Sequence, residues 1–267
     1  MKKHCYILFL LLCFSNSLFS QKHADLYDSK SFVYKNDTLQ YRMLLPKNFT
    51  EDKQYPLVLV LHGAGERGNN NSSQLVHGSN LFASDENREQ FPAIVIFPQC
   101  PKGDYWANAT IDRSSKPIKL KFSLDSKPTK SLELVMNLLQ TYLQKPFVKK
   151  EQIYVGGLSM GGMGTFEILY RQPNIFAAAF SICGAGDPEG AKEYAKNTNL
   201  WVFHGANDDV VNPQESINMV SGILKHGGKP NFSLYANDNH NSWDSAFAEP
   251  ALLPWLFSKS KRIKNDK

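Results

Sequence analysis

One serine in this chain stands in a pattern that would make it a nucleophile. Ser159 lies in the sequence Gly157-Leu158-Ser159-Met160-Gly161, with a short apolar run before it, starting at Ile153, and a helix-compatible run after it, at residues 165–171. A serine on a sharp turn from strand to helix holds its hydroxyl out at the carboxyl end of a sheet, and flanking glycines avoid steric clash. The pattern favours an activated serine. A glycine-rich turn with an incidental serine is the alternative.

A serine hydroxyl becomes a good nucleophile only beside a base that a carboxylate orients. In sheets of this class the three groups follow one another along the chain as serine, acid and histidine. The acid candidates are Asp208 and Asp209, in the loop after the apolar run 200–203. His226 sits in the last turn of a predicted helix, where its expected role is to stabilise the helix end. His240 lies in a loop after the last predicted strand, so we predict that it is the base.

A second glycine-rich turn could stabilise negative charge. The sequence His62-Gly63-Ala64-Gly65 follows the continuous apolar run 57–61. Such a turn can present a backbone N–H group to an oxyanion. We predict that Ala64, or alternatively Gly65, donates one hydrogen bond, and that Met160, at the start of the helix after the nucleophile, donates the other. A phosphate-binding turn is less favoured because no lysine follows the glycines as it does in a P-loop.

Other histidines and the cysteines bear on metal binding. His62 and His204 each end a predicted strand just before a glycine, and we expect buried structural roles for both. The chain has no His-x-x-x-His pair and no Cys-x-x-Cys pair, so the sequence predicts no metal site, and the chemistry needs no cofactor. Cys100 and Cys183 are too few for a disulfide framework, and the sequence leaves open whether they pair.

Apolar runs of strand length alternate with helical patterns along the chain. A hairpin is predicted at residues 32–45, and the later strand-like runs are residues 57–61, 93–97, 153–155, 176–183, 200–203 and 232–235. The alternation predicts an α/β fold with a doubly wound, mostly parallel sheet and helices on both faces. Ligands bind such sheets outside the carboxyl ends of the strands, where all the polar motifs above fall.

Two connecting segments bear on access to this edge of the sheet. Residues 102–127 are rich in lysine with scattered aromatic residues, and we predict an irregular excursion beside the edge. Residues 184–199, between two predicted strands, are too few for a large lid. An open groove suits an exposed substrate better than a long lipid chain at an interface.

The first twenty residues differ from the rest. Two lysines precede a short apolar run and a small-residue end, which is typical of a secretory signal peptide at residues 1–20. An uncleaved anchor is the alternative, although the run is too short to span a bilayer comfortably. Lipidation at Cys13 is disfavoured because small residues before it are missing. We therefore expect a secreted or periplasmic protein, residues 21–267, with no stable membrane association after cleavage.

Length, composition and charge restrict the class of protein. The chain has 267 residues, of which 42% are hydrophobic, and this suits one α/β catalytic domain over residues 21–267. The formal charge of +5 falls to +3 when Lys2 and Lys3 leave with the signal peptide. No interleaving of aromatic and basic residues supports nucleic-acid binding, which is therefore not expected.

Taken together, these motifs resemble those of α/β-hydrolases over nearly all of the mature chain. The resemblance is strongest to secreted esterases and predicted peptidases related to dienelactone hydrolases, phospholipase/carboxylesterases, and feruloyl and acetylxylan esterases. The motifs that carry it are residues 61–68, Phe97-Pro98-Gln99-Cys100, Gly157-Leu158-Ser159-Met160-Gly161-Gly162, His204-Gly205 with Asp208 and Val211, and His240-Asn241-Ser242-Trp243.

The resemblance also assigns individual residues. In the family the acid is the fourth residue after the histidine of the His-Gly pair, which implies Asp208. Asp209, beside it, departs from the usual pattern. By analogy with the family, Trp106 and Trp243 wall the substrate pocket, and packing at the sheet edge is the alternative for both. Glu66 and Arg67 either pair to stiffen the oxyanion turn or are solvated.

The resemblance implies a secreted serine hydrolase. Its substrate would be a carboxylic ester, with a short acyl or aryl group, in a small molecule or on a glycan, cleaved through an acyl-serine intermediate. A serine peptidase of the prolyl-oligopeptidase type is one alternative, although such peptidases normally carry a gating domain. A non-catalytic binding protein on the same fold is another. The sequence specifies neither the acyl group, the alcohol nor the oligomeric state.

Overall fold

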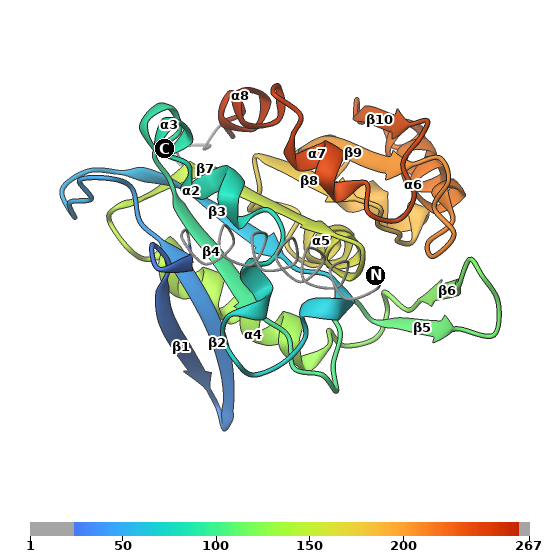
Figure 1. Ribbon diagram of the computed structural model, residues 1–267, viewed down its shortest axis with the longest axis horizontal. Coiled ribbons are helices and arrows are strands. Elements are labelled where there is room, and N and C mark those ends of the chain that lie inside the picture. Colours follow the sequence, from blue (N-terminus) through green and yellow to red (C-terminus); the bar gives the residue numbers. More distant parts are fainter. Residues whose placement is uncertain (1–23, 262–267) are drawn as a thin grey trace, which may run out of the picture.

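The computed structural model describes residues 24–261, so the predicted signal peptide and Cys13 lie outside the described residues. The main sheet has eight strands in the order β1-β2-β4-β3-β7-β8-β9-β10 (Figure 1). Its strands are β1 (Asp28–Tyr34), β2 (Asp37–Leu44), β3 (Tyr55–Leu61), β4 (Ile94–Gln99), β7 (Val148–Leu158), β8 (Ala178–Ile182), β9 (Asn199–Gly205) and β10 (Asn231–Tyr235).

The sheet is mostly parallel, as the alternation of strands and helices predicts. The strands from β4 to β10 pair in parallel, whereas β1 pairs antiparallel with β2, and β2 pairs antiparallel with β4. The predicted hairpin is therefore confirmed. Its turn includes Lys35, whose φ of 54° lies in the left-handed region.

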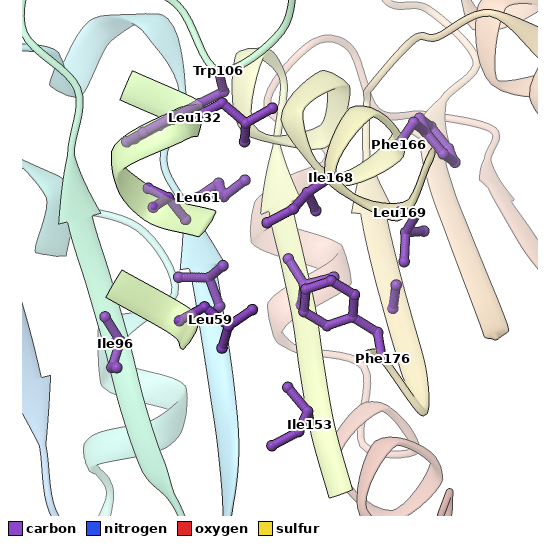
Figure 2. Packing of buried hydrophobic residues seen from close by; sticks show 14 of the residues in the cluster. Leu59, Leu61, Ile96, Trp106, Leu132, Ile153, Phe166, Ile168, Leu169 and Phe176 are labelled. Atoms are coloured by element: carbon purple, nitrogen blue, oxygen red, sulfur yellow. The ribbon is translucent and has the colours of Figure 1, made fainter. Parts of the chain in front are cut away.

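Helices cover both faces of the sheet because alternate strand residues point in opposite directions. From β3, Leu57, Leu59 and Leu61 join one buried cluster, part of which Figure 2 shows, and Val58 and Val60 join another. The first cluster also includes residues of α4 (Lys130–Leu143), α5 (Met160–Arg171) and α6 (Pro213–Lys225). The second includes residues of α2 (Ser79–Ala83), α7 (Trp243–Phe247) and α8 (Leu252–Phe257). This arrangement confirms the predicted doubly wound architecture.

Residues that favour helix ends stand at both ends of α6. The Asn212 side chain accepts a hydrogen bond from the backbone N–H of Gln214, and Pro213 is the first helical residue. Gly227 follows the helix with a φ of 83°, a conformation that glycine adopts at little cost. Among residues 24–261, none of the helices combines the length and apolar character needed to cross a bilayer.

The structure corrects the prediction for residues 102–127. This segment contains a two-stranded antiparallel sheet, β5 (Ala109–Asp112) and β6 (Lys119–Phe122), which projects from the body in Figure 1. Leu120 and Phe122 pack against a small buried cluster that includes Met163 and Val211. Exposed lysines alternate with these apolar residues over only four positions, which is too short a pattern to identify a strand from sequence. The structure also contains the short helix α3 (Asp85–Gln90), which, like α2 and α7, has no counterpart among the elements predicted from the sequence.

Candidate active site

The candidate nucleophile sits on a strained turn between β7 and α5. Ser159 has φ 51° and ψ −116°, in a region that non-glycine residues rarely adopt. Its backbone N–H donates a 2.8 Å hydrogen bond to the carbonyl of Ile182 at the end of β8. A Cβ atom at Gly157 would come within 2.6 Å of the Leu61 carbonyl oxygen, and one at Gly161 would overlap it. Glycine at these two positions therefore lets the turn pack directly on the end of β3.

The structure brings the three predicted side chains together from separate loops. His240 Nε2 lies 3.0 Å from Ser159 Oγ, and His240 Nδ1 lies 2.7 Å from Asp208 Oδ2. These residues follow β10, β7 and β9, respectively, at the carboxyl edge of the sheet. The arrangement can move a proton from the serine hydroxyl to an imidazole whose other nitrogen is held by a carboxylate.

Asp208 accepts four hydrogen bonds. Its Oδ1 receives the backbone N–H groups of Val210 at 2.8 Å and Val211 at 2.9 Å, and its Oδ2 receives His240 and His204. Burial opposes ionisation of this carboxyl, but the hydrogen bonds from the two histidines outweigh burial and hold the pKa of Asp208 well below its usual range. Asp209 is exposed, so the geometry favours Asp208 as the acid.

His204 contributes more than the structural role expected from the sequence. It is fully buried, its Nε2 lies 3.1 Å from Asp208 Oδ2, and its Nδ1 lies 2.7 Å from Ser216 Oγ. Asp208 Oδ2 is thus shared between two imidazoles, which restricts the rotation of the carboxylate. The sequence signal for this contact is the spacing of four residues between His204 and Asp208, because a tight turn between them can bring the side chains together.

The predicted oxyanion donors begin two helical segments. Ala64 is the first residue of the 3-10 helix η1 (Ala64–Glu66), and Met160 is the first residue of α5. The first N–H groups of a helix have no partner within it and are free to meet an anion. The roles of Ala64 and Met160 remain predictions that this placement allows.

Arg67 holds the turn at Ala64 in place without pairing with Glu66. Its Nε donates to the Ala64 carbonyl at 3.0 Å, and its Nη1 donates to the carbonyls of Lys102 and Asp104. Glu66 instead approaches His77, with 3.7 Å between Oε1 and Nε2. Backbone contacts, and not the Glu66–Arg67 ion pair considered from the sequence, therefore hold this turn.

His62 also holds the turn at residues 62–65 in place. It is buried, its Nδ1 donates to the Gly63 carbonyl at 2.6 Å, and its Nε2 accepts the backbone N–H of Cys100 at 3.0 Å. Burial lowers the pKa of His62 to about 4, so the imidazole is neutral at pH 7. The predicted structural role of His62 agrees with these contacts.

The two tryptophans lie in different environments. Trp106 has no exposed surface, and its indole N–H donates to the His62 carbonyl at 3.0 Å. A side chain without exposed surface cannot line an open pocket, so the pocket prediction for Trp106 is wrong and the packing alternative holds. Trp243 is half-buried and packs edge-on against His240, with 5.4 Å between ring centroids. Its contact with substrate remains a prediction.

The cysteines are not paired with each other. Cys100 and Cys183 are both buried free thiols. Burial raises the pKa of Cys100 to about 12 and raises that of Cys183 further, so both thiols are protonated at neutral pH. Of the two, only Cys183 lies beside Asp208 and His240. Together with Asp208 and His240 it makes a group of potential metal ligands among residues 24–261.

A family model described as "Putative esterase" matches residues 34–250. The chain belongs to this esterase family. A curated relative, the bifunctional acetylxylan esterase/xylanase XynS20E of Neocallimastix patriciarum, is 28% identical over 172 residues, which are 64% of this chain and 21% of that protein. The match spans only about a fifth of the relative's length, so most of that protein lies outside the matched region.

Solved structures agree with this family. A thermostable esterase is 31% identical, with a TM-score of 0.79 over 90% of this chain and 64% of that one. A ferulic acid esterase from Anaeromyces mucronatus, solved with ferulic acid, has a TM-score of 0.59 over 87% of this chain and 90% of that one. Its identity is 16%, so this second similarity concerns the fold alone. The α/β-hydrolase fold predicted from the sequence is thereby confirmed.

We predict that His62 makes the free energy of unfolding depend on pH in mildly acidic solution. An unfolded histidine titrates near pH 6.5, whereas the pKa of His62 is lowered to about 4. The unfolded chain therefore binds the extra proton between these values. The stabilisation is complete above about pH 6.5 and falls by about 3 kcal/mol as the pH approaches 4.

Urea denaturation at several pH values measures this effect. The His62→Gln variant is expected to lose less stability than the wild type between pH 6.5 and 4. The His77→Gln variant is the control, because the side chain of His77 is 27% exposed. Equal pH dependence in the His62→Gln variant and the wild type would contradict the assignment.

We also predict that Gly161→Ala destabilises the fold and abolishes the site. The new Cβ would overlap the Leu61 carbonyl oxygen, so the turn and β3 must separate, at a cost of about 1–3 kcal/mol or more. Gly103→Ala is the matched control, since among the described residues nothing lies within 4 Å of the Cβ it would add. Urea denaturation of both variants, compared with the wild type, checks the difference. Similar stabilities would refute the close-packing argument.

Proposed function

We propose that this chain is a serine esterase that cleaves a carboxylic ester through an acyl-Ser159 intermediate. One observation carries the proposal. His240 Nε2 lies 3.0 Å from Ser159 Oγ while His240 Nδ1 lies 2.7 Å from the buried, ionised carboxylate of Asp208. This is the geometry that a general base needs to activate a serine. Membership of the esterase family supports the same reaction class.

In the proposed reaction His240 accepts the proton of Ser159 as its oxygen attacks the ester carbonyl. Asp208 orients the imidazole and stabilises its cation. The backbone N–H groups of Ala64 and Met160 hold the negative charge of the tetrahedral intermediate. The intermediate expels the alcohol, which takes its proton from His240. His240 then takes a proton from a water molecule, which attacks the acyl-enzyme. The acid is released as Ser159 takes that proton back from His240.

The proposed substrate is a short acyl or aryl ester, either free or attached to a glycan. Similarity to an acetylxylan esterase/xylanase and to a ferulic acid esterase fold supports this class. Among the described residues, the segment between β8 and β9 carries only the 3-10 helix η3 (Pro188–Glu193), which is too small to be a large lid. We further propose that residues 1–20 direct secretion or periplasmic export and that residues 21–267 form one catalytic domain.

Hydrolysis of short-chain p-nitrophenyl esters by the mature protein tests the reaction. We predict that Ser159→Ala reduces kcat/KM by roughly 10⁴-fold or more, because alanine has no hydroxyl with which to form the acyl-enzyme. Substrates for the next step are acetylated glycans, feruloyl esters and a peptide nitroanilide. Turnover of the nitroanilide in preference to every ester would replace the esterase proposal with the peptidase alternative.

The neighbouring carboxylates provide a matched pair of variants. Asp208→Asn should lower kcat by roughly 10³–10⁴-fold, because an amide cannot stabilise the His240 cation and favours the wrong tautomer. Asp209→Asn removes an exposed carboxylate and should leave kcat close to that of the wild type. Full activity in the Ser159 and Asp208 variants, with folding verified, would point to a different catalytic site. No activity in the folded wild type against any of these substrates would support the binding-protein alternative.

A further inference from the structure

The hairpin formed by β5 and β6 is strongly basic, and the proposed reaction makes no use of it. Its cations are all exposed, and they are Arg113, Lys116, Lys119 and Lys121. Asp112 is the only carboxylate in residues 109–122, so this basic hairpin has a formal charge of +3. Residues 21–267 as a whole also have a formal charge of +3, so all the other residues of that range sum to zero. Positive charge is thus concentrated on one short projecting element.

The cations of the basic hairpin are free to meet an anion. Among the described residues, none of their side chains forms an ion pair. Lys119 and Lys121 alternate along β6 with Leu120 and Phe122, which pack against the buried cluster that includes Met163. Because successive side chains of a strand point to opposite faces, the two lysines point into solvent.

One side of the basic hairpin is anchored to the loop that carries Asp208. The backbone N–H of Ile118 donates a 2.9 Å hydrogen bond to the carbonyl of Val210. The N–H of Val210 donates in turn to the Asp208 carboxylate at 2.8 Å. Ile118 also packs against the small buried cluster to which Val211 belongs. The hairpin therefore has a fixed position relative to the candidate acid.

The other side of the hairpin reaches the turn at Ala64 through Tyr105. Arg113 Nη2 donates to the Tyr105 hydroxyl at 3.2 Å, and the Tyr105 ring centroid lies 5.0 Å from the guanidinium carbon of Arg67. Arg67 holds the Ala64 carbonyl. In the sheet, β7 lies between β3, which precedes this turn, and β9, which precedes the Asp208 loop. The base of the hairpin therefore spans the stretch of sheet edge at which Ser159 lies, and the hairpin projects outward from there (Figure 1).

Given the proposed esterase function, on which this step rests, we propose that the basic hairpin binds a glycan that carries both the ester and carboxylate groups, such as those of uronic acids. Clustered cations attract a polyanion and raise its local concentration beside the site. The four residues of each strand extend about 13 Å. A short ester at Ser159 cannot reach the cations along this length, whereas a polymer can occupy both places at once.

Two other polyanions, nucleic acids and anionic membranes, fit the basic hairpin less well. Phe122 is its only aromatic residue and packs against a buried cluster, so no ring is available to stack on a base. Among the described residues, none of the exposed large hydrophobic side chains belongs to the hairpin, so it offers nothing to insert into lipid. A carboxylated glycan needs neither feature, because the charges themselves attract it.

Calorimetric titration of the mature protein with polygalacturonate tests the surface without requiring any activity, because this polymer carries no acyl ester. Binding at low ionic strength should weaken as sodium chloride is added. The double variant Lys119→Glu/Lys121→Glu changes the formal charge of residues 109–122 from +3 to −1, and its Kd should rise by roughly tenfold or more.

The matched control is the double variant Lys145→Glu/Lys150→Glu. It makes the same change of charge at two exposed lysines near the amino end of β7, whereas Ser159 follows the carboxyl end. Its Kd should stay close to that of the wild type. Absence of binding to polygalacturonate, or equal weakening by both double variants, would overturn the proposal. Hairpin-dependent binding to phosphatidylglycerol vesicles, with none to polygalacturonate, would assign the surface to a membrane instead.

Hydrolysis by the same variants tests the consequence for catalysis. In Lys119→Glu/Lys121→Glu, kcat/KM for acetylated polygalacturonate should fall by roughly tenfold, mainly through KM, because the hairpin binds the polymer and takes no part in the reaction. The values for acetylated glucomannan, a neutral glycan, and for p-nitrophenyl acetate should stay unchanged. An equal loss on all three substrates would contradict recognition of charge. If the protein hydrolyses no ester, the esterase proposal fails, and the polygalacturonate titration still decides whether the hairpin binds an acidic glycan.

Discussion

The contact on which the site depends is the close approach of two pieces of backbone, the turn at Gly161 and the end of β3 at Leu61. A single added carbon at Gly161 would overlap the Leu61 carbonyl. This contact brings the nucleophile turn next to the turn that begins at His62. Trp106 packs beside this contact. Its indole N–H donates to the His62 carbonyl, and its Cβ lies where a side chain at Gly164 would be. The distance between the turn at Ser159 and the turn at His62 is therefore set by close packing of backbone atoms.

The electrostatics of the site depend on Asp208 in a similar way. Four N–H donors converge on a carboxylate that is removed from water, so its charge is balanced by dipoles and not by a counterion. Such an anion can stabilise a cation that forms on His240 during the reaction without first having to give up a resident partner. His204 limits the orientations of the carboxylate, and Ser216 in turn holds His204.

Much of this arrangement could be predicted from the sequence, because continuous apolar runs identify buried parallel strands and capping residues identify helix ends. The chain order of serine, acid and histidine is the one that the resemblance to α/β-hydrolases implies. The features that could not be predicted depend on how the loops fold over the edge of the sheet. The sequence places Trp106 in a polar segment and gives no sign that it is buried. Asp208 and Asp209 are neighbours of one type, and only the backbone N–H groups of the following valines distinguish them.

The position of Cys183 shows what the convergence of loops demands of a group beside Asp208 and His240. A thiol that ionised near neutral pH would place a second anion beside His240 and would compete with Asp208 for its proton. Burial, and after it the negative charge of Asp208, raise the pKa of Cys183 and prevent this. In the free protein the sulfur is thus an uncharged neighbour, and Asp208 alone sets the tautomer of His240.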